Sequence, residues 1–405
     1  FMKTYLVGGA VRDKLLGIPV KDRDWVVTGA TPEEMINEDF KAVGEDFPVF
    51  LHPKTKEEYA LARTERKSGK GYKGFTFYSS PKITLEDDLK RRDITINAIA
   101  EDENGNLIDP YDGKTDLKNG VLRHVSSAFV EDPLRVLRVA RFAACFGFKI
   151  ADETMELLNI ISKSGELNEL IPERVWTEMK KALTGKYPSR FILALRSCHA
   201  LEELFPEIES LFGVPQDKKY HPEIDVGRHT LMSLNQSVRL SPDPLIRFAV
   251  LVHDLGKATT PKEQLPNHDG HEERGVSIIN SFCERYKVPN KYHDLAVCVS
   301  EFHLDCHRIQ EMGAEEVLEK LEKLDAFRRT ERFKQFLIAC ESDSRGRAGY
   351  EDKEFPQAKY FLDALEISKN IDLDLLKNKG LDGKKLGDAL KKERIKALKE
   401  KLLSN

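Results

Sequence analysis

The sequence predicts an α+β protein, with a small mixed sheet and helices in the N-terminal third and a helical remainder. Three observations support this fold class. Short apolar runs between turn residues fill positions 2 to about 125, as is typical of strands. From about residue 130 the apolar residues recur at helical spacing. The chain has 405 residues, of which 40% are apolar, so several domains are expected.

The expected strands are four short apolar runs, at 5–7, 25–27, 49–51 and 59–62. The first expected helix carries Leu134, Leu137, Val139, Phe142 and Ala143 on one face. The same spacing predicts helices within 154–162, 189–197, 245–252 and 313–324. The Lys-rich segment 377–401 is amphipathic and is expected to be a charged, solvated helix.

Composition limits the classes of partner. The 64 basic and 68 acidic residues give a formal net charge of -4, so a nucleic acid would bind through local patches and not over the whole surface. No run reaches the ~20 apolar residues of a membrane helix, and the N-terminus does not resemble a signal peptide. We expect a cytoplasmic protein with no membrane partner. The six scattered cysteines are expected to be reduced thiols.

The first candidate site follows the first strand. Gly8 and Gly9 come between that strand and a helix start, where backbone N–H groups without a Cβ nearby favour a phosphate. Farther along, Asp22 and Asp24 form an Asp-x-Asp pattern that enters an apolar strand. Strand alternation places both carboxylates on one face, where they are expected to bind Mg²⁺ and serve phosphoryl transfer.

A second pattern fits the recognition of nucleotide bases. Asp132 and Arg135 stand at i and i+3 at the start of the expected helix, so both project from one face. A carboxylate with a guanidinium offers hydrogen-bond acceptors beside donors, which complements a base edge that carries both. Arg138 and Arg141 continue this face, and with Arg92 they form a group of cations expected to be unpaired and to contact a triphosphate and base.

These motifs resemble the nucleotidyltransferase superfamily of polymerase β, and within it the bacterial class II CCA-adding tRNA nucleotidyltransferases. Four segments carry the resemblance in the order of the family: Leu6–Asp13, Lys21–Trp25, Arg91–Ala98 and Glu131–Arg138. The resemblance implies template-independent addition of C, C and A to the tRNA acceptor end from CTP and ATP, with release of pyrophosphate. It implies a polymerase-β-like head that uses Mg²⁺.

The resemblance also implies roles for single residues. Asp22 and Asp24 would be catalytic, and Arg92 with Asp93 would recognise the ribose. Asp132 and Arg135 would be the protein template for the base, because a carboxylate with a guanidinium matches the amino donor and ring-nitrogen acceptor that C and A share, whereas U and G present the opposite pattern. The further residues implied to contact the nucleotide are Gly9, Arg12, Arg138 and Arg141. The third metal-binding carboxylate stays open among Glu57, Glu58 and Asp93. The basic, aromatic stretch 63–78 is expected to be a mobile loop near the active site.

A cluster of histidines and aspartates predicts a second site. His253 and Asp254 end an apolar helix, where burial of both side chains would cost several kcal/mol unless they bind something. His229 upstream and Asp343 downstream complete the order of the HD-type metal-dependent phosphohydrolases. A divalent ion such as Ni²⁺ is expected there. Alternative positions, as further ligands or phosphate contacts, are His268, His271, His303 and Asp305.

Within CCA-adding enzymes, the HD cluster implies the multifunctional bacterial form, which has phosphatase, 2′-nucleotidase and 2′,3′-cyclic phosphodiesterase activities. The expected domains are the head at 1–140, a helical neck at 141–215, the HD domain at 216–328 and a helical tail at 329–405. A monomer or a homodimer is compatible with the sequence. The main alternative is an enzyme like bacterial poly(A) polymerase, disfavoured by the acidic segment 43–48 and by the HD cluster. A regulatory HD protein with an inactive head is disfavoured because both Asp22 and Asp24 are present.

Overall fold

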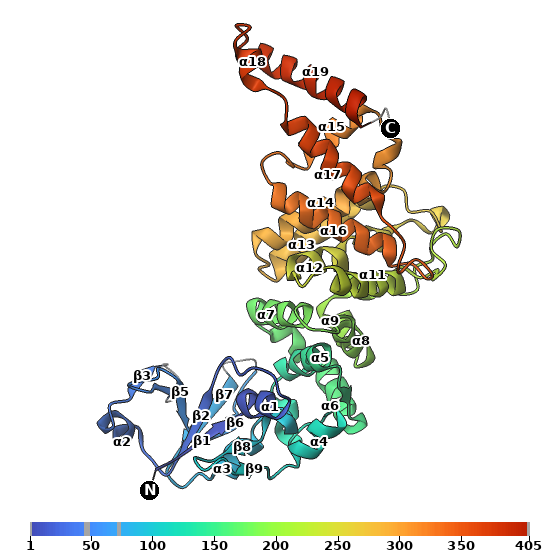
Figure 1. Cartoon of the computed structure of the whole chain (residues 1–405). Helices are drawn as coiled ribbons and strands as arrows, with labels where there is room; N and C mark the ends of the chain where they lie inside the picture. The colour runs from blue at the N-terminus through green and yellow to red at the C-terminus, as the bar shows by residue number, and fades with distance from the viewer. Residues whose placement is uncertain (1, 44–48, 71–73, 403–405) are drawn as a thin grey trace. The chain divides into compact units, whose positions relative to one another are not determined.

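The computed structural model describes residues 2–43, 49–70 and 74–402, and the chain divides into two compact units, Phe1–Phe205 and Pro206–Asn405. Unit 1 contains the sheet, and unit 2 is helical (Figure 1). Among the described residues, no helix combines the length and the apolar character that crossing a membrane requires. The acidic segment 44–48 and the loop residues 71–73 lie outside the described residues.

A seven-stranded mixed sheet organises unit 1, with the strand order β3-β4-β5-β2-β1-β8-β9. β2 and β5 pair in parallel, and the other neighbours are antiparallel. The strands are β1 Lys3–Val7, β2 Asp24–Thr28, β3 Lys41–Val43, β4 Val49–Leu51, β5 Glu58–Leu61, β8 Ala100–Glu101 and β9 Leu107–Ile108. All four strands predicted from apolar runs are confirmed within this sheet.

The basic stretch 63–78, expected to be a loop, contains strands. β6 (Arg63–Lys67) and β7 (Phe75–Ser79) pair as a separate antiparallel hairpin. Aromatic and β-branched residues such as Phe75, Thr76 and Phe77 favour this extended structure. Two further short strands, β10 (Val121–Leu122) and β11 (Lys149–Ile150), pair in parallel farther along unit 1.

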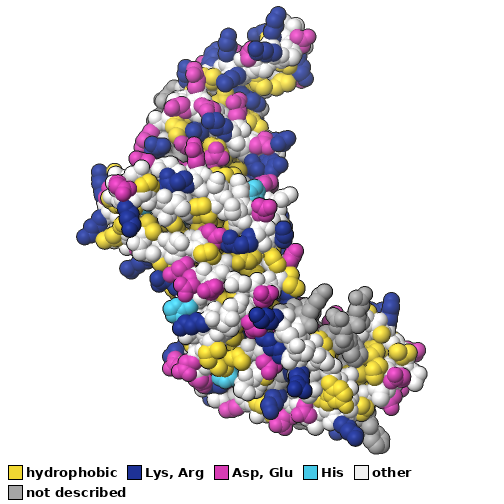
Figure 2. Space-filling model, turned by 180° about the vertical axis from the view of Figure 1, so that it is seen from behind, with side chains coloured by type: hydrophobic (Ala, Val, Ile, Leu, Met, Phe, Trp, Pro, Cys, Tyr) yellow, Lys and Arg dark blue, Asp and Glu magenta, His cyan; other side chains and the backbone are white. Residues whose placement is uncertain are grey.

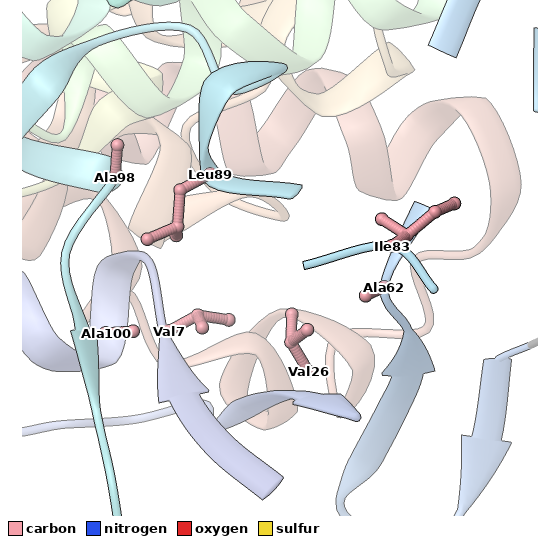
Figure 3. Packing of buried hydrophobic residues seen from close by; sticks show 7 residues of the cluster. All are labelled: Val7, Val26, Ala62, Ile83, Leu89, Ala98 and Ala100. Atoms are coloured by element: carbon pink, nitrogen blue, oxygen red, sulfur yellow. The ribbon is translucent and has the colours of Figure 1, made fainter. Parts of the chain in front are cut away.

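A buried apolar cluster joins the sheet to the segment that carries Arg91 and Arg92. Figure 3 shows its seven buried members: Val7, Val26, Ala62, Ile83, Leu89, Ala98 and Ala100. Val7 and Val26 come from β1 and β2, and Leu89 from helix α3 (Leu85–Lys90). The core therefore fixes the Gly-Gly turn after β1 and the start of β2 relative to the arginines that follow α3.

Short and long helices complete unit 1. They are α1 Gly9–Leu15, α2 Pro32–Asn37, α4 Gly113–Asn119, α5 Leu134–Phe146, α6 Asp152–Lys163, α7 Pro172–Leu183, α8 Ser189–Ser197 and α9 Ala200–Leu204, with 3₁₀ turns η2 Thr95–Asn97, η3 Ser127–Glu131 and η4 Glu166–Glu169. The predicted helices within 154–162 and 189–197 are confirmed. The domain boundary expected at residue 140 falls inside α5, which packs against both α7 and α8.

Unit 2 is built on five packed helices: α11 Val226–Leu240, α12 Pro244–Val252, α13 His271–Arg285, α14 Asn290–His307 and α16 Thr330–Arg345 (Figure 1). The helices α12, α14 and α16 pack on one another, α11 packs on α12 and α16, and α13 packs on α14. The other elements are α10 Pro206–Glu209, η5 Leu255–Thr259, η6 Lys262–Gln264, η7 Ile309–Glu311, α15 Ala314–Lys323, α17 Pro356–Lys369, α18 Leu373–Lys377 and α19 Gly383–Lys401. The helices predicted within 245–252 and 313–324 are confirmed as α12 and α15. The Lys-rich helix α19 is largely exposed, and Leu398 is among its few buried residues.

Charges of both signs are interspersed on the face of the chain seen in Figure 2, where Lys and Arg side chains lie among Asp and Glu. This distribution agrees with the near balance of charge in the sequence. Any anionic partner must therefore be recognised by particular groups of side chains.

Candidate active sites and metal centre

The Gly-Gly turn between β1 and α1 leaves little room for side chains. Gly8 has a φ of +69°, which favours glycine, and a Cβ there would lie 3.1 Å from Nη1 of Arg92. A Cβ on Gly9 would lie 3.3 Å from Nη2 of Arg12. The absence of side chains thus lets two guanidinium groups approach the backbone of the turn.

Asp22 and Asp24 both lie on the surface at the start of β2, with Asp22 before the strand and Asp24 as its first residue. Desolvation raises the pKa of the Asp24 carboxyl, the positive charge of Arg92 lowers it, and the negative charge of Asp22 raises it further. The two carboxylates therefore repel each other, a repulsion that a divalent cation relieves. Both residues fit the Mg²⁺ expected from the sequence, because Mg²⁺ binds through one or two carboxylates.

The three candidates for a third carboxylate differ in their surroundings. Glu58 of β5 pairs in register with Asp24, so the two side chains share one face of the sheet. Glu57 accepts a hydrogen bond from Nε1 of Trp25 at 2.9 Å. Asp93 is buried and forms an ion pair of 2.7 Å with Nε of Arg138. Glu58 is thus the candidate beside Asp24.

Arg92 depends on a buried carboxylate that the sequence motifs did not single out. Asp88 of α3 is fully buried, and its Oδ2 accepts a hydrogen bond from Nη2 of Arg92 at 3.3 Å. Its Oδ1 accepts from Nε of Arg91 at 3.1 Å and from the backbone N–H of Arg63 at 3.2 Å. Burial alone would raise the pKa of Asp88, but the two guanidinium charges lower it below its ordinary value. The i+3 and i+4 spacing from Asp88 to Arg91 and Arg92 was the signal in the sequence.

The arginines of the candidate nucleotide site are paired, so the expectation of unpaired cations is wrong. Arg138 pairs with Asp93, and Nε of Arg141 lies 2.5 Å from Oε2 of Glu178 on α7. Nη1 of Arg12 donates to Oδ1 of Asn97 at 2.7 Å. The carboxylate partners lie about 40 residues away along the chain, and only the packing of α5 brings them close.

One aromatic ring gathers three of these arginines. The guanidinium carbons of Arg12, Arg138 and Arg141 lie 5.4, 5.5 and 4.1 Å from the ring centroid of Phe142 on α5. Such cation–π contacts stabilise guanidinium groups that approach one another. The structure therefore brings together three of the predicted nucleotide contacts.

The sequence predicted that Asp132 and Arg135 project from one face of a helix, and this prediction is wrong. α5 begins at Leu134, and Asp132 lies before it in an extended conformation. Pro133 at the N-cap separates the two, and Oδ1 of Asp132 accepts a hydrogen bond from the Leu134 N–H at 3.0 Å. The buried Arg135 donates to the carbonyl oxygens of Ala128 and Arg91. The side chains of Asp132 and Arg135 therefore both form hydrogen bonds with backbone groups and not with each other.

The HD residues of unit 2 meet at one buried cluster. His229 comes from α11, His253 follows α12, Asp254 precedes η5 and Asp343 comes from α16. Nε2 of His229 lies 2.8 Å from Oδ1 of Asp343, and Nε2 of His253 lies 3.2 Å from the same oxygen. Nε2 of His253 is also 3.3 Å from Oδ2 of Asp254. The structure thus brings all four predicted ligands together.

The electrostatics of the cluster favour a positive charge. Burial alone would lower the pKa of His253, but the charges of Asp254 and Asp343 raise it well above its ordinary value. Oδ1 of Asp254 and Nε2 of His253 are buried and make no well-aligned hydrogen bond with any described residue, whereas Oδ2 of Asp254 faces Nζ of Lys257 at 2.9 Å. A divalent cation satisfies these atoms, so the residues present fit the expected metal.

Two of the four alternative residues belong to this cluster. His271 of α13 and His303 of α14 approach Asp254 from the other side, at 3.4 and 3.5 Å from its Oδ1. Burial lowers the pKa of His303 to about 3, and the charge of Asp254 opposes this shift. His268 instead bonds to Thr260 and the Pro215 carbonyl, and Asp305 pairs with Lys320 at 3.0 Å.

Further residues at this cluster were missed from the sequence. Lys257 is buried, with Nζ 2.9 Å from Oδ2 of Asp254, and its position three residues after Asp254 was a signal. Oε1 of the buried Glu223 lies 3.2 Å from Nδ1 of His229 and thereby orients that ring. Nε2 of His307 lies 2.6 Å from Oδ2 of Asp343, four residues after His303 on α14.

Three family models match successive parts of the chain. A poly A polymerase head domain matches residues 4–123, a probable RNA and SrmB-binding site of polymerase A matches 147–212, and an HD domain matches 226–330.

Curated relatives match almost the whole length. The chain is 57% identical over 402 residues to a multifunctional CCA protein of Thioalkalivibrio sulfidiphilus, and 53% identical over 399 residues to one of Nitrosococcus oceani. Each match covers 98% of both chains. Among solved structures, a Thermotoga maritima CCA-adding enzyme complexed with tRNA is similar at a TM-score of 0.64 and 23% identity, with 98% of this chain and 87% of that one covered. A Bacillus stearothermophilus CCA-adding enzyme in complex with CTP has a TM-score of 0.58 and 25% identity, with 98% and 88% covered.

Proposed function

The chain belongs to the family of multifunctional CCA proteins, and from this premise we propose that it adds C, C and A to the 3′ end of tRNA. CTP and ATP are the substrates, no template is used, and pyrophosphate is released. The observation that carries this proposal is the juxtaposition of Asp24, the Gly-Gly turn and Arg92 at one end of the central strands β1 and β2. We place the enzyme in the cytoplasm as a monomer or a homodimer.

The catalytic carboxylates are Asp22 and Asp24, and Glu58 is the third carboxylate because it is in register with Asp24. Mg²⁺ held by these residues supplies positive charge for phosphoryl transfer. The residues around them bind and orient the triphosphate. The backbone of Gly8 and Gly9 admits phosphate oxygens closely, and Arg92, which Asp88 holds in place, donates to the anion beside it.

Base selection falls to Asp132 and Arg135, which accept from and donate to the edge that C and A share. In the structure, both side chains bond to backbone groups instead. Nucleotide binding therefore requires Arg135 to leave the carbonyls of Ala128 and Arg91 and turn toward the base. The exchange replaces each backbone hydrogen bond with one to the correct base, whereas U or G places a ring N–H donor where C and A present a ring-nitrogen acceptor to the guanidinium.

The test uses a tRNA that lacks its 3′ end. Labelled CTP and then ATP should be incorporated by the full chain, and Asp22→Asn should abolish incorporation. Asp39→Asn is the matched control, because Asp39 is an exposed aspartate after α2 whose positive φ asparagine also tolerates. Absence of C incorporation by the unaltered chain refutes the proposal, and addition of A alone favours the poly(A) polymerase alternative.

The buried His and Asp cluster favours a second activity, metal-dependent phosphohydrolysis by unit 2. We infer that His229, His253, Asp254 and Asp343 hold a divalent ion such as Ni²⁺, which polarises a phosphate ester. The activities inferred are phosphatase, 2′-nucleotidase and 2′,3′-cyclic phosphodiesterase. His253→Ala should abolish hydrolysis of a 2′,3′-cyclic phosphate and leave C incorporation intact, and Asp22→Asn should do the reverse. Loss of both activities in either variant contradicts two separate sites.

A further inference from the structure

A pocket of about 500 Å³ opens on unit 2 at the N-terminal ends of three helices. Leu245 lies in the first turn of α12, Lys291 lies in the first turn of α14, and Thr330 begins α16. Arg328 and Arg329, which precede α16, also line the pocket. Neither activity proposed above uses this pocket, so it requires an explanation of its own.

The pocket lies at the other end of these helices from the buried His and Asp cluster. His253 directly follows α12, and His303 and Asp343 lie near the C-terminal ends of α14 and α16. With a rise of about 1.5 Å per residue, Arg332 at the pocket is about 16 Å from Asp343 along the axis of α16. A ligand in the pocket therefore occupies a place separate from that cluster.

Cations outnumber carboxylates in the wall of the pocket. Its cations are Lys291, Arg328, Arg329 and Arg332, and its carboxylates are those of Asp294 and Glu331. Asp294 pairs with Arg329 at 3.2 Å, and Glu331 pairs with Lys334 at 3.0 Å. Beside the pocket, Asp325 pairs with Arg328 at 2.6 Å. Each of these carboxylates thus already has a cation of its own.

Three further cations at the pocket pair with no carboxylate of a described residue. Nη2 of the half-buried Arg332 donates to the Leu324 carbonyl oxygen at 2.8 Å. Nζ of Lys369, the last residue of α17, donates to Oγ1 of Thr330 at 2.8 Å. Lys291 is exposed in the wall itself. These three charges favour an anionic ligand.

The backbone adds to this positive field. The N-terminal end of a helix carries a partial positive charge and unpaired N–H groups. Asp243 caps α12 by accepting a hydrogen bond from the Leu245 N–H at 2.9 Å. In contrast, no side chain within the described ranges caps α14 or α16. The ends of α14 and α16 therefore face the same pocket as the cations without an anionic cap.

We propose that this pocket binds a phosphate group. Guanidinium and ammonium groups donate charge-assisted hydrogen bonds to phosphate oxygens, and uncapped helix ends bind the same anion. Two sources present this chemistry, a phosphate of the tRNA backbone and free inorganic phosphate. The proposal depends on neither activity proposed above, because none of the pocket residues belongs to either site.

Acetylation of lysines reports whether the pocket is occupied. The full chain is treated with a trace of acetic anhydride, and peptide mass spectrometry gives the rate at each lysine. Inorganic phosphate at about four times its Kd should slow acetylation of Lys291 about 5-fold, compared with chloride at equal ionic strength. Lys359 of α17 is the control within the same chain, because it is exposed and pairs with Asp363 outside the pocket. Its rate should not change.

Arg332→Gln tests the pocket itself. Glutamine keeps a donor for the Leu324 carbonyl oxygen but removes the charge, so phosphate should slow acetylation of Lys291 by less than about 2-fold at the same concentration. Lys323→Gln is the matched control, because it removes one exposed charge of α15 outside the pocket. It should keep the full protection. An unchanged rate at Lys291 without phosphate shows that the wall of the pocket is intact in both variants.

No protection of Lys291 by either phosphate or tRNA overturns the proposal, and so does full protection in the folded Arg332→Gln variant. A tRNA that lacks its 3′ end distinguishes the two sources. If the tRNA backbone is the source, this tRNA protects Lys291, and Arg332→Gln lowers the slope of log Kd against log salt by about 1. Protection by phosphate alone identifies the free anion as the ligand. Protection by tRNA alone with an unchanged slope overturns the proposal, because the RNA then covers the pocket without a phosphate contact.

Discussion

Gly256→Ala should disrupt the metal centre through a single methyl group. Gly256 lies in the turn η5, two residues after Asp254, where η5 crosses helix α13. A Cβ there would lie 1.9 Å from the His271 carbonyl oxygen and 2.7 Å from the Gly275 backbone nitrogen. Both obstacles are backbone atoms of α13, so no side-chain rotation relieves the clash.

The magnitude follows from the distance. An ordinary carbon contact requires about 3.5 Å, so η5 and α13 must separate by about 1.5 Å. Overpacking of a rigid core costs about 1–3 kcal/mol, and the upper end is expected against backbone. For a unit of roughly 200 residues this corresponds to a fall of about 6–12 °C in Tm. The same shift moves Asp254 away from His271, and a displacement of about 1 Å reduces catalysis about 100-fold.

Thermal unfolding and hydrolysis of a 2′,3′-cyclic phosphate measure the two effects. The matched control is Gly387→Ala in α19 of the same unit, where no atom lies within 4 Å of the added Cβ. That change should raise stability by up to about 1 kcal/mol, because alanine is the better helix former. A Gly256→Ala variant with unchanged Tm and unchanged hydrolysis would refute the argument that the close crossing positions the site.

Three predictions concern unit 1. Asp88→Asn should raise KM for CTP and ATP about 10-fold, because asparagine can still bond to Arg92 but no longer forms the ion pair that holds its guanidinium in place. An unchanged KM in steady-state assays would contradict this role. Burial alone would raise the pKa of Asp93, but the charge of Arg138 holds this pKa well below its ordinary value. The ion pair of Asp93 with Arg138 therefore contributes to stability above pH ~4, and this contribution is lost as the pH falls through the lowered pKa. Asp93→Asn should therefore lower the free energy of unfolding at pH 7 by about 3 kcal/mol and flatten its decline below pH 5, as denaturant titrations at several pH values will show. Arg135→Ala should relax the choice of CTP and ATP over UTP in incorporation assays, and discrimination equal to that of the unaltered enzyme would exclude Arg135 from base selection.

The sequence predicted the elements that local chemistry specifies. The strands β1 and β2 were evident because their apolar runs end at turn residues. Helix α12 was evident because its apolar residues are nearly continuous. The stretch 63–78 was expected to be a loop because of its basic charge and its glycines, with aromatic residues available to stack on RNA. The hairpin β6–β7 forms there because the pairing of the two strands satisfies backbone groups that no local pattern reveals.

The same division holds at the candidate sites. The adjacency of His253 and Asp254 after an apolar helix predicted a metal centre, and His229 and Asp343 followed from the order of the motif. Glu223 was missed because a single charged residue in a turn carries no periodic signal, and Lys257 because its spacing of three residues from Asp254 does not by itself show that it is buried. Their roles depend on burial, which forces each charge to find a partner in the fold.

By itself the sequence determined the chemistry that is available: a turn without side chains, two carboxylates at a strand, and histidines with aspartates at the ends of helices. The tertiary structure decided how these groups are paired. Arg141 meets Glu178 because α5 packs on α7, and Asp254 lies between two pairs of histidines because four helices, α11 to α14, bring their histidines to it. His229 and Asp343 are 114 residues apart in the chain and 2.8 Å apart in space. The physical reason is that a buried charge needs a partner, and only helix packing selects which one it receives.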